Sequence, residues 1–187
     1  MLYAGSLVPT KGVHTAIEAL GKLSEQAEFE RLHLSLVGSG RADYEAHLHK
    51  LVAWYGLEDR VSFVGRVPRE EMPRILRQHD VLLFPSTGEA LPRVVQEAMA
   101  CGLVVIGTTA GGTREILIEG ETGLTFLPGD ADGLACQIER LNRDPDLFQR
   151  LAAQGRDLIV RQFDIQKTLD GIETYLLRVV NTPHPAV

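Results

Sequence analysis

Two glutamates with seven residues between them mark the stretch of this sequence that is best suited to chemistry, GEALPRVVQEAMACG at residues 88–102. Glu89 and Glu97 flank a helix-forming segment that we expect to begin near Leu91, which places Pro92 in its first turn, where a missing N–H costs nothing. The first turn of a helix offers free N–H groups and a positive dipole end to an anion. A carboxylate accepts two hydrogen bonds from a vicinal diol, as in sugars and ribose.

This spacing predicts a site for a nucleotide sugar held at three points. Eight residues of helix rise about 12 Å, which is close to the span from a sugar ring across a diphosphate to a ribose. Sugar hydroxyls would bind Glu89, the diphosphate the helix start, and the ribose Glu97. The simpler alternative makes Glu89 a favourable charge near a helix start and Glu97 a solvated side chain. The apolar run AMACGLVVI after Glu97 favours the first interpretation.

Short apolar runs alternate with amphipathic segments along the chain, and they predict the elements that must position these glutamates. Strands are expected at 1–5, 32–38, 61–65, 80–86, 103–108 and 123–127, and helices at 12–23, 43–57, 69–79, 91–101, 131–144, 145–163 and 164–180. Pro73 is unfavourable within its predicted helix. Trp54 and Tyr55 are expected to pack against the rest of the domain. The pattern indicates a doubly wound, Rossmann-like α/β fold, with a parallel sheet of about six strands and helices on both faces.

Loops containing glycine follow five of these predicted strands, at 5–7, 38–40, 65–67, 86–92 and 108–113. In a doubly wound sheet, ligands bind at the carboxyl ends of the strands. We therefore expect these loops to share one site. Gly111 and Gly112 are expected to let the backbone approach a ligand closely, with ordinary turn glycines as the alternative.

Composition excludes several other classes of protein. The chain has 187 residues, 44% of them hydrophobic, which fits one domain or a large fragment of a two-domain protein. A net charge of −6 disfavours a nucleic-acid partner. No transmembrane segment or signal peptide is predicted. Cys101 and Cys136 form neither a disulfide framework nor a metal motif, which indicates a cytoplasmic location. His47 and His49, two apart on a helix, point to different sides, so no metal site is predicted.

The stretch STGEALPRVVQEAMACGLVVIGTTAGGTREILIEGETGLTFLPGD, residues 86–130, resembles the signature region of a known family. This family comprises the retaining, GT-B-fold glycosyltransferases of the glycogen-synthase-like and mannosyltransferase-like superfamily (glycosyl transferases group 1). The segments 3–20 and 36–72 are similar to its opening strand, loop and helix and to its middle, and the resemblance extends to about residue 180. The matching motif residues are Glu89, Glu97, Ala98, Met99, Ala100, Gly102, Gly111, Gly112, Glu115 and the TGL at 122–124.

The resemblance implies roles for individual residues. Lys11 matches the lysine that binds the donor diphosphate, and Glu89 the glutamate near the donor sugar hydroxyls, so these two are the catalytic candidates. Glu97 matches the ribose-binding glutamate. The remaining binding positions are Ala90, Leu91 and Pro92 in the loop beside the sugar and phosphates, Arg66 and Val67 in the loop that contacts the base, and Ser6 in the first loop.

Three departures from the family pattern bear on this assignment. The family usually has an arginine where this chain has Ser6, so charge on the leaving group would come from elsewhere, with Arg93 or Arg66 as candidates. The loop ALP at 90–92 stands where GFG is common, which would change the sugar that fits, and its proline cannot donate an N–H to a phosphate. The N-terminal domain with the acceptor site is absent from this chain, so we expect a donor-binding domain at 1–180 and a frayed tail at 181–187.

The function implied is donor binding in a retaining transferase that moves a hexose-type sugar to a carbohydrate or lipid-linked acceptor. Protein charge would stabilise the diphosphate leaving group, so neither a metal nor another cofactor is expected. This chain alone is expected to be inactive. The full-length enzyme to which it would belong, here called the parent, is expected to make at most peripheral contact with the inner face of a membrane. Two alternatives stay open: a non-catalytic nucleotide- or sugar-binding module, and another GT-B-fold enzyme such as a nucleotide-sugar epimerase. The EAMACG and GGTREI segments argue against the epimerase.

Overall fold

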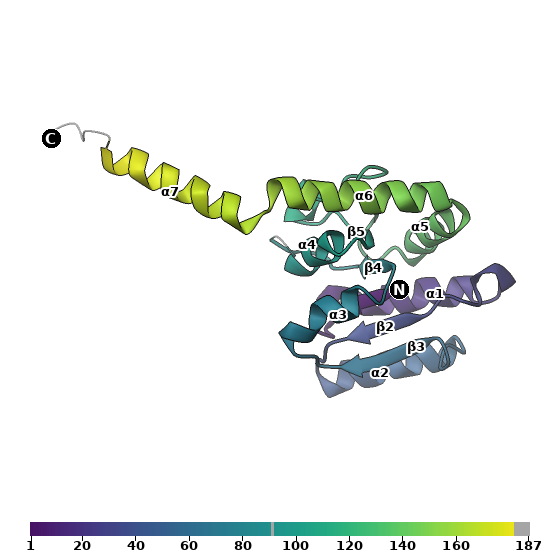
Figure 1. Cartoon of the computed structure of the whole chain (residues 1–187). Helices are drawn as coiled ribbons and strands as arrows, with labels where there is room; N and C mark the ends of the chain where they lie inside the picture. Colours follow the sequence, from purple (N-terminus) through teal and green to yellow (C-terminus); the bar gives the residue numbers. More distant parts are fainter. Residues whose placement is uncertain (91, 182–187) are drawn as a thin grey trace.

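A sheet of six parallel strands forms the centre of the computed structural model, which describes residues 1–90 and 92–181. The strands are β1 (Leu2–Ala4), β2 (Leu34–Val37), β3 (Val61–Gly65), β4 (Val81–Phe84), β5 (Val104–Thr108) and β6 (Leu124–Phe126). They lie in the order β3-β2-β1-β4-β5-β6 (Figure 1). The predicted doubly wound α/β fold is therefore confirmed, with every predicted strand present.

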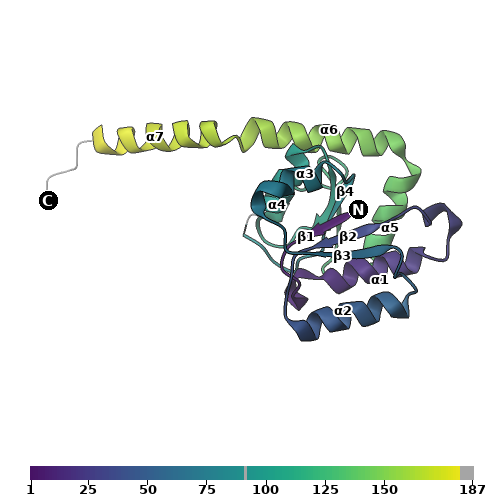
Figure 2. The same ribbon diagram turned by 60° about the horizontal axis from the view of Figure 1, so that its bottom comes forward.

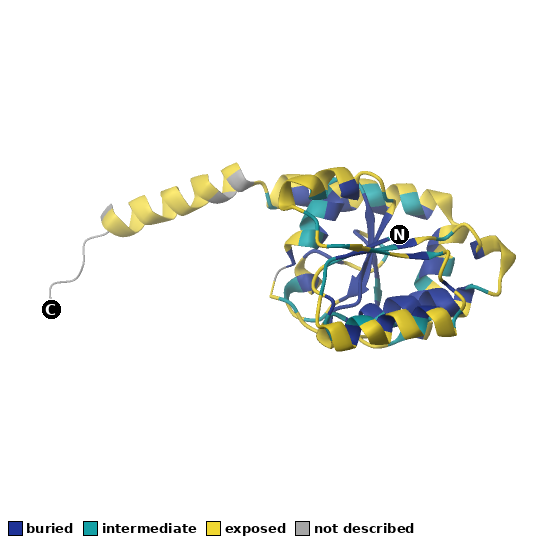
Figure 3. Ribbon diagram, turned by 90° about the horizontal axis from the view of Figure 1, so that it is seen from below, coloured by how far each residue is buried: buried dark blue, intermediate teal, exposed yellow. Residues whose placement is uncertain are grey.

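Helices cover both faces of this sheet, so that most strand residues are buried (Figure 3). They are α1 (Val13–Leu23), α2 (Ala42–Trp54), α3 (Met72–Leu76), α4 (Arg93–Ala100), α5 (Ala131–Arg143), α6 (Pro145–Gln162) and α7 (Ile165–Asn181), with short 3-10 helices at Pro9–Lys11, Ala27–Phe29, Arg69–Glu71 and Gly112–Glu115. Buried residues of α1, α2 and α5 share one core cluster, and those of α3 and α4 share the other. Every residue of β4 and β5 is buried, which explains their continuous apolar runs.

The order of the strands reverses between β1 and β4. From β1 the chain moves outward to β2 and β3, and then returns to place β4 on the other side of β1. Leu2 of β1 accordingly pairs with Ser35 on one side and with Leu82 on the other. The helices that follow β1 and β4, α1 and α4, pack into different core clusters and so cover opposite faces of the sheet. Such a reversal opens a crevice at the carboxyl ends of the two strands.

The segment before α4 differs from the sequence prediction. The helix begins at Arg93, and Pro92 is its N-cap residue with an extended backbone, so Pro92 does not lie within the first turn as predicted. Leu91 lies outside the described residues. Because Glu89 precedes the helix, the helical rise does not set its spacing from Glu97, and the argument from about 12 Å of helix is wrong.

Two further predictions about helices need correction. The helix predicted at 69–79 is a 3-10 turn followed by the short α3, which ends at Leu76, and Pro73 lies in the first turn of α3, where proline is tolerated. Trp54 was expected to pack, but 82% of its surface is exposed at the end of α2. Tyr55 is half-buried, as expected.

The last helix, α7, extends away from the domain (Figures 1 and 2). Its exposed apolar residues are Leu169, Ile172, Tyr175, Leu176, Leu177, Val179 and Val180. Among the helices of residues 1–90 and 92–181, none combines the length and the apolar character needed to cross a bilayer. The predicted tail, apart from Asn181 at the end of α7, lies outside the described residues.

Candidate functional site

The loops after β1 and β4 are bonded to each other beside the crevice. The backbone N–H and the side-chain hydroxyl of Thr87 both donate hydrogen bonds to the carbonyl oxygen of Thr10, at 2.9 and 3.0 Å. Next to them, the Lys11 ammonium group donates a hydrogen bond to the Glu89 carboxylate in an ion pair. The structure therefore brings together the two predicted catalytic residues, which lie 78 positions apart in the sequence.

The loop after β5 holds Glu89 from the other side. The N–H of Gly112 donates to the Glu89 carbonyl oxygen at 2.9 Å, and Gly111 forms an isolated parallel bridge with Glu89. Gly111 has a φ of 70°, and a β-carbon there would collide with that same carbonyl oxygen. The close approach to the Glu89 backbone explains this glycine without a ligand, which differs from the role predicted for it.

Lys11 is positioned by the turn that starts α1. It ends the 3-10 helix Pro9–Lys11, and Gly12 follows with a φ of 66° against the carbonyl oxygen of Pro85. The side chain of Lys11 is 28% exposed and that of Glu89 26%. Both groups are therefore mostly shielded from water while remaining partly open to a ligand.

Tyr3 stabilises the backbone of the loop after β1 through a hydrogen bond. Its hydroxyl donates a hydrogen bond to the carbonyl oxygen of Ser6 at 2.8 Å. Burial raises the pKa of Tyr3, and the neighbouring Tyr44 and Glu89 raise it further through charge repulsion. Tyr3 is therefore a neutral donor that fixes the backbone at Ser6.

A cavity of about 360 Å³ lies over the junction of β1 and β4 and is here called the switch-point cavity. Four of the predicted site residues line it, namely Ser6, Lys11, Glu89 and Pro92. The other lining residues are Tyr3, Ala4, Gly5, Phe84, Ser86, Arg93 and Val94.

A second cavity of about 350 Å³, here called the outer cavity, adjoins the first and lies toward β2 and β3. The two share Ala4, Gly5, Ser6 and Val94. Three further predicted residues line the outer cavity, namely Arg66, Val67 and Glu97. Its remaining lining residues are Val37, Gly38, Ser39 and Met72. The two glutamates therefore line neighbouring cavities, both of which are also lined by Gly5 and Ser6 of the loop after β1.

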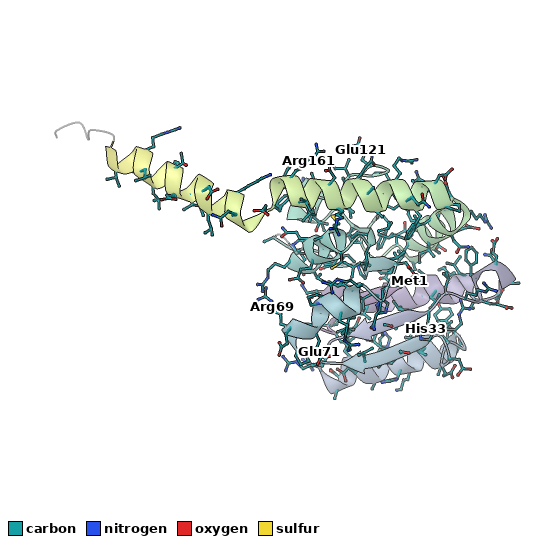
Figure 4. The ribbon with its side chains drawn as sticks, in the orientation of Figure 1. Met1, His33, Arg69, Glu71, Glu121 and Arg161 are labelled. Atoms are coloured by element: carbon teal, nitrogen blue, oxygen red, sulfur yellow. The ribbon has the colours of Figure 1, made fainter. Side chains whose placement is uncertain are left out.

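Glu97 has a cationic neighbour that sequence reasoning missed. The guanidinium group of Arg69 lies 3.9 Å from the Glu97 carboxylate, and the two side chains are 73% and 42% exposed. Figure 4 shows Arg69 at the edge of the domain beyond the end of β3. Its position three residues after the predicted loop residue Arg66 was the available signal.

Two predicted residues are not placed in either cavity. Ala90 is exposed beside the switch-point cavity without lining it. Leu91 lies outside the described residues. The roles assigned to all the site residues stay predictions, but the structure brings most of them together around two adjoining cavities.

The two cavities suit an elongated ligand with an anionic centre. Lys11 and Arg93 supply positive charge to the switch-point cavity, and Arg66 supplies it to the outer cavity. Glu89 and Glu97 offer carboxylate acceptors on the two sides. Within the described part of the chain, no three His, Cys, Asp or Glu side chains gather as metal ligands would. His47 stacks with Tyr44 and His49 with Phe63, so the two histidines serve different contacts.

The largest cavity described, of about 580 Å³, lies at the amino-terminal edge of the sheet. Met1, His33, His79 and Asp80 are among its lining residues, and none of the predicted site residues is. Figure 4 shows Met1 and His33 on the side of the domain away from Arg69. Because parallel sheets bind ligands at their carboxyl edge, the smaller pair of cavities is the candidate site.

Fold and crevice together define a Rossmann-like α/β domain with a cavity lined by basic side chains at its topological switch point. The family model for glycosyl transferases group 1 matches residues 1–158, and the chain belongs to this family. The resemblance found in the sequence is thereby confirmed, and the fold is that of the C-terminal domain of GT-B glycosyltransferases.

Curated relatives span different biosynthetic activities. The chain is 34% identical over 179 residues to the lipopolysaccharide core biosynthesis glycosyltransferase LpsE of Rhizobium meliloti, covering 96% of this chain and 49% of LpsE. It is 32% identical to a glycogen synthase of Mycobacterium tuberculosis, covering 89% of this chain and 39% of that protein. The chain thus spans about half or less of the length of these relatives.

Solved structures agree with this assignment. HepE of Anabaena, crystallised in complex with UDP, superposes with a TM-score of 0.87 at 30% identity, covering 95% of this chain and 48% of HepE. The C-terminal domain of the group 1 glycosyl transferase LpcC of Francisella tularensis superposes with a TM-score of 0.81 at 26% identity, covering 88% of this chain and 85% of that domain.

Proposed function

We propose that this chain is the donor-binding domain of a glycosyltransferase and binds a nucleoside diphosphate sugar across the two cavities. The observation that carries the proposal is the placement of Glu89 and Glu97 in adjoining cavities, with Lys11, Arg93 and the start of α4 at the switch-point end. The sugar would bind near Glu89, the diphosphate near Lys11 and α4, and the ribose near Glu97.

The structural relatives support a nucleotide sugar as the ligand. HepE, which is 30% identical to this chain, was crystallised with UDP and also with UDP-glucose. Its complex with UDP-glucose superposes on this chain with a TM-score of 0.86. The proposal extends this ligand class to the present chain, while the base and the sugar are left to experiment.

The proposed reaction is a retaining transfer of a hexose-type sugar. The bond from the sugar to the diphosphate breaks as the acceptor oxygen attacks, and negative charge develops on the departing phosphate. Lys11 and the free N–H groups at the start of α4 would stabilise that charge. The departing phosphate would help to take the proton of the acceptor, and no metal is required because protein charge serves that purpose.

The acceptor, a carbohydrate or a lipid-linked sugar, would be bound by a second domain. Two observations support this part of the proposal: the chain spans about half of LpsE and HepE, and α7 exposes an apolar face that no residue of the described domain covers. This chain alone should bind donor without efficient transfer. A cytoplasmic location, with peripheral membrane contact of the parent, also stays a prediction. It is supported by Cys101 and Cys136, which are both free thiols.

Calorimetric titration with UDP, GDP, ADP and dTDP, followed by the matching sugar nucleotides, tests the proposal. We expect one base to be preferred and its binding to be weakened about tenfold or more in Glu97→Ala, because a charge-assisted hydrogen bond is lost. Glu121→Ala is the matched control, since that exposed carboxylate lies outside both cavities and well apart from Arg69 (Figure 4).

The outcomes separate the proposal from its alternatives. If a chain shown to be folded binds none of these nucleotides, the donor-domain proposal is wrong. If it binds nucleotides but a full-length parent transfers no sugar, the chain is a binding module. If the parent interconverts sugar nucleotides without an acceptor, it is an epimerase.

A further inference from the structure

The switch-point cavity has two basic side chains, and only one of them is paired with a carboxylate. Lys11 and Arg93 are the basic side chains among its lining residues. Lys11 is engaged by the Glu89 carboxylate. Arg93 is exposed, and no hydrogen bond or ion pair joins its side chain to any of residues 1–90 and 92–181. The basic group that is free to meet an incoming anion in this cavity is therefore Arg93.

The position of Arg93 in α4 is unfavourable for the helix itself. Arg93 is the first residue of α4, whose first turn contains no acidic residue. The helix dipole is positive at this end and favours anions over cations there. Pro92, the N-cap, supplies neither a side-chain acceptor nor an N–H. A cation kept at such a place is a local conflict of the kind that proteins retain at functional sites, and a bound anion would remove it.

We infer that Arg93 binds the diphosphate of the donor, together with Lys11 and the first N–H groups of α4. This inference rests on the proposed function and names the cation that makes the site selective for a diphosphate. Val94, the next residue of α4, lines both cavities, so the first turn of this helix lies where the two cavities meet. A ligand that spans both cavities brings its central diphosphate to that turn.

The other arginines near the site are less well placed. Arg66 lines the outer cavity but not the switch-point cavity. Arg69 is engaged by Glu97 at 3.9 Å. Ser6 lines both cavities but carries no charge. Arg93 thus supplies to the diphosphate the positive charge that Ser6 does not.

The test compares Arg93→Gln with the wild type in titrations of a nucleoside, its monophosphate and its diphosphate, using the base that the wild type prefers. We expect affinity for the diphosphate to fall about tenfold or more, as for the loss of a charge-assisted contact, with affinity for the nucleoside changed less than about twofold. The salt dependence of diphosphate binding should weaken, and the melting temperature should stay the same or rise. Arg150→Gln, which removes an exposed arginine of α6 outside both cavities, is the control for net charge.

A rescue variant adds a second, independent result. Ser6→Arg placed on Arg93→Gln returns a guanidinium group to a position that lines the same cavity, and should restore the ratio of diphosphate to nucleoside affinity. Arg93→Lys keeps the charge without the planar fork and should give an intermediate ratio. It also serves in place of the glutamine variant if that variant fails to fold.

The inference and the proposed function fail in different ways. If the wild type binds nucleotides and Arg93→Gln leaves the ratio of diphosphate to nucleoside affinity unchanged, this inference is overturned and the proposed function stands. A ratio lost in Arg66→Gln but kept in Arg93→Gln would assign the contact to Arg66 and overturn it as well. If the wild type binds no nucleotide, the proposed function fails, and the inference fails with it.

Discussion

At the scale of single residues, the ion pair between Lys11 and Glu89 joins the side chains proposed to bind the diphosphate and the sugar. Under the proposed function, a complete donor would replace both partners of this pair, whereas a bare nucleoside diphosphate would engage Lys11 and leave Glu89 without its cation. The pair should therefore favour the sugar nucleotide over the bare nucleotide. This consequence follows from the contact itself and could not be read from either residue alone.

Glu89→Gln tests this preference. Removing the carboxylate charge frees Lys11, so the bare nucleoside diphosphate should bind more tightly by up to about fivefold, in line with the about 0.2–1 kcal/mol of a partly exposed ion pair. The advantage of the sugar nucleotide should shrink at the same time, because the amide is a poorer acceptor for sugar hydroxyls. Calorimetric titration of both ligands measures the two effects, and weaker binding of the bare nucleotide would contradict the argument.

Tyr3 gives a prediction in the alkaline range. Because burial raises the pKa of Tyr3, folding favours its neutral phenol. The stability that Tyr3 contributes is thus fully present below its ordinary pKa of about 10 and is lost as the pH rises above it. Tyr3→Phe should lower the free energy of unfolding by about 1 kcal/mol at neutral pH, through loss of the hydrogen bond to Ser6.

Denaturation in urea between about pH 8 and pH 11 measures this effect. The free energy of unfolding of the variant should decline less steeply with pH than that of the wild type, so that the two curves converge at the alkaline end. Parallel curves would show that Tyr3 titrates in the folded protein as it does in the unfolded chain.

At the scale of elements, the loop after β5 acts as a support for the Glu89 segment. Gly111→Ala would place a β-carbon against the Glu89 carbonyl oxygen. It should both cost stability, by about 1 kcal/mol or more for the positive φ alone, and weaken sugar-nucleotide binding by displacing Glu89. Thermal melting and titration on the same variant separate these two effects.

Gly129→Ala is the matched control for this substitution. Gly129 has a similar φ of 78°, but a β-carbon there meets nothing within 4 Å. This variant should therefore lose stability through backbone strain while binding the sugar nucleotide as the wild type does. Equal binding losses in the two variants would mean that the approach of Gly111 to Glu89 does not position the site.

Element types and their order could be predicted from the sequence, because each buried strand is a short apolar run bounded by loops. The boundaries of helices near proline could not be predicted in this way. Pro73 starts a helix rather than interrupting one, and Pro92 precedes its helix. Both outcomes depend on where the preceding chain turns, which is a property of the tertiary structure and not of the local pattern.

Much of the candidate site could also be predicted, because its residues follow strands whose carboxyl ends must meet at one edge. The contacts between those residues could not. Lys11 meets Glu89 across 78 positions, and Gly111 serves the Glu89 backbone rather than a ligand. Such pairings depend on strand order, which places β1 beside β4, and no periodicity within a single segment encodes it.

At the scale of the whole molecule, the site and α7 lie toward the same side of the domain. β2 and β3 end on the side toward which α7 extends (Figure 1). A partner domain that covers the apolar face of α7 would also lie near the two cavities. This arrangement would let an acceptor held by the proposed second domain reach a donor bound in the two cavities.

The apolar face of α7 should consequently contribute little to the stability of this domain. Leu169, Ile172 and Leu176 are each more than 50% exposed, and none belongs to either core cluster. Replacing all three with alanine should change the free energy of unfolding by no more than about 1 kcal/mol, as for surface positions. Leu151→Ala in α6 is the contrasting control, since Leu151 is fully buried and its truncation should cost about 2–5 kcal/mol.

Urea denaturation of the two variants in this chain measures how much the apolar face of α7 contributes to stability. The same measurement on the full-length protein shows which domain α7 contacts. One outcome is that the triple substitution leaves the stability of this chain unchanged but destabilises the full-length protein. In that case the helix packs on the other domain. If the triple variant is destabilised in this chain to the extent of Leu151→Ala, then α7 folds back on its own domain in solution. The apolar face would in that case belong to the core, and α7 would not be available to a partner domain.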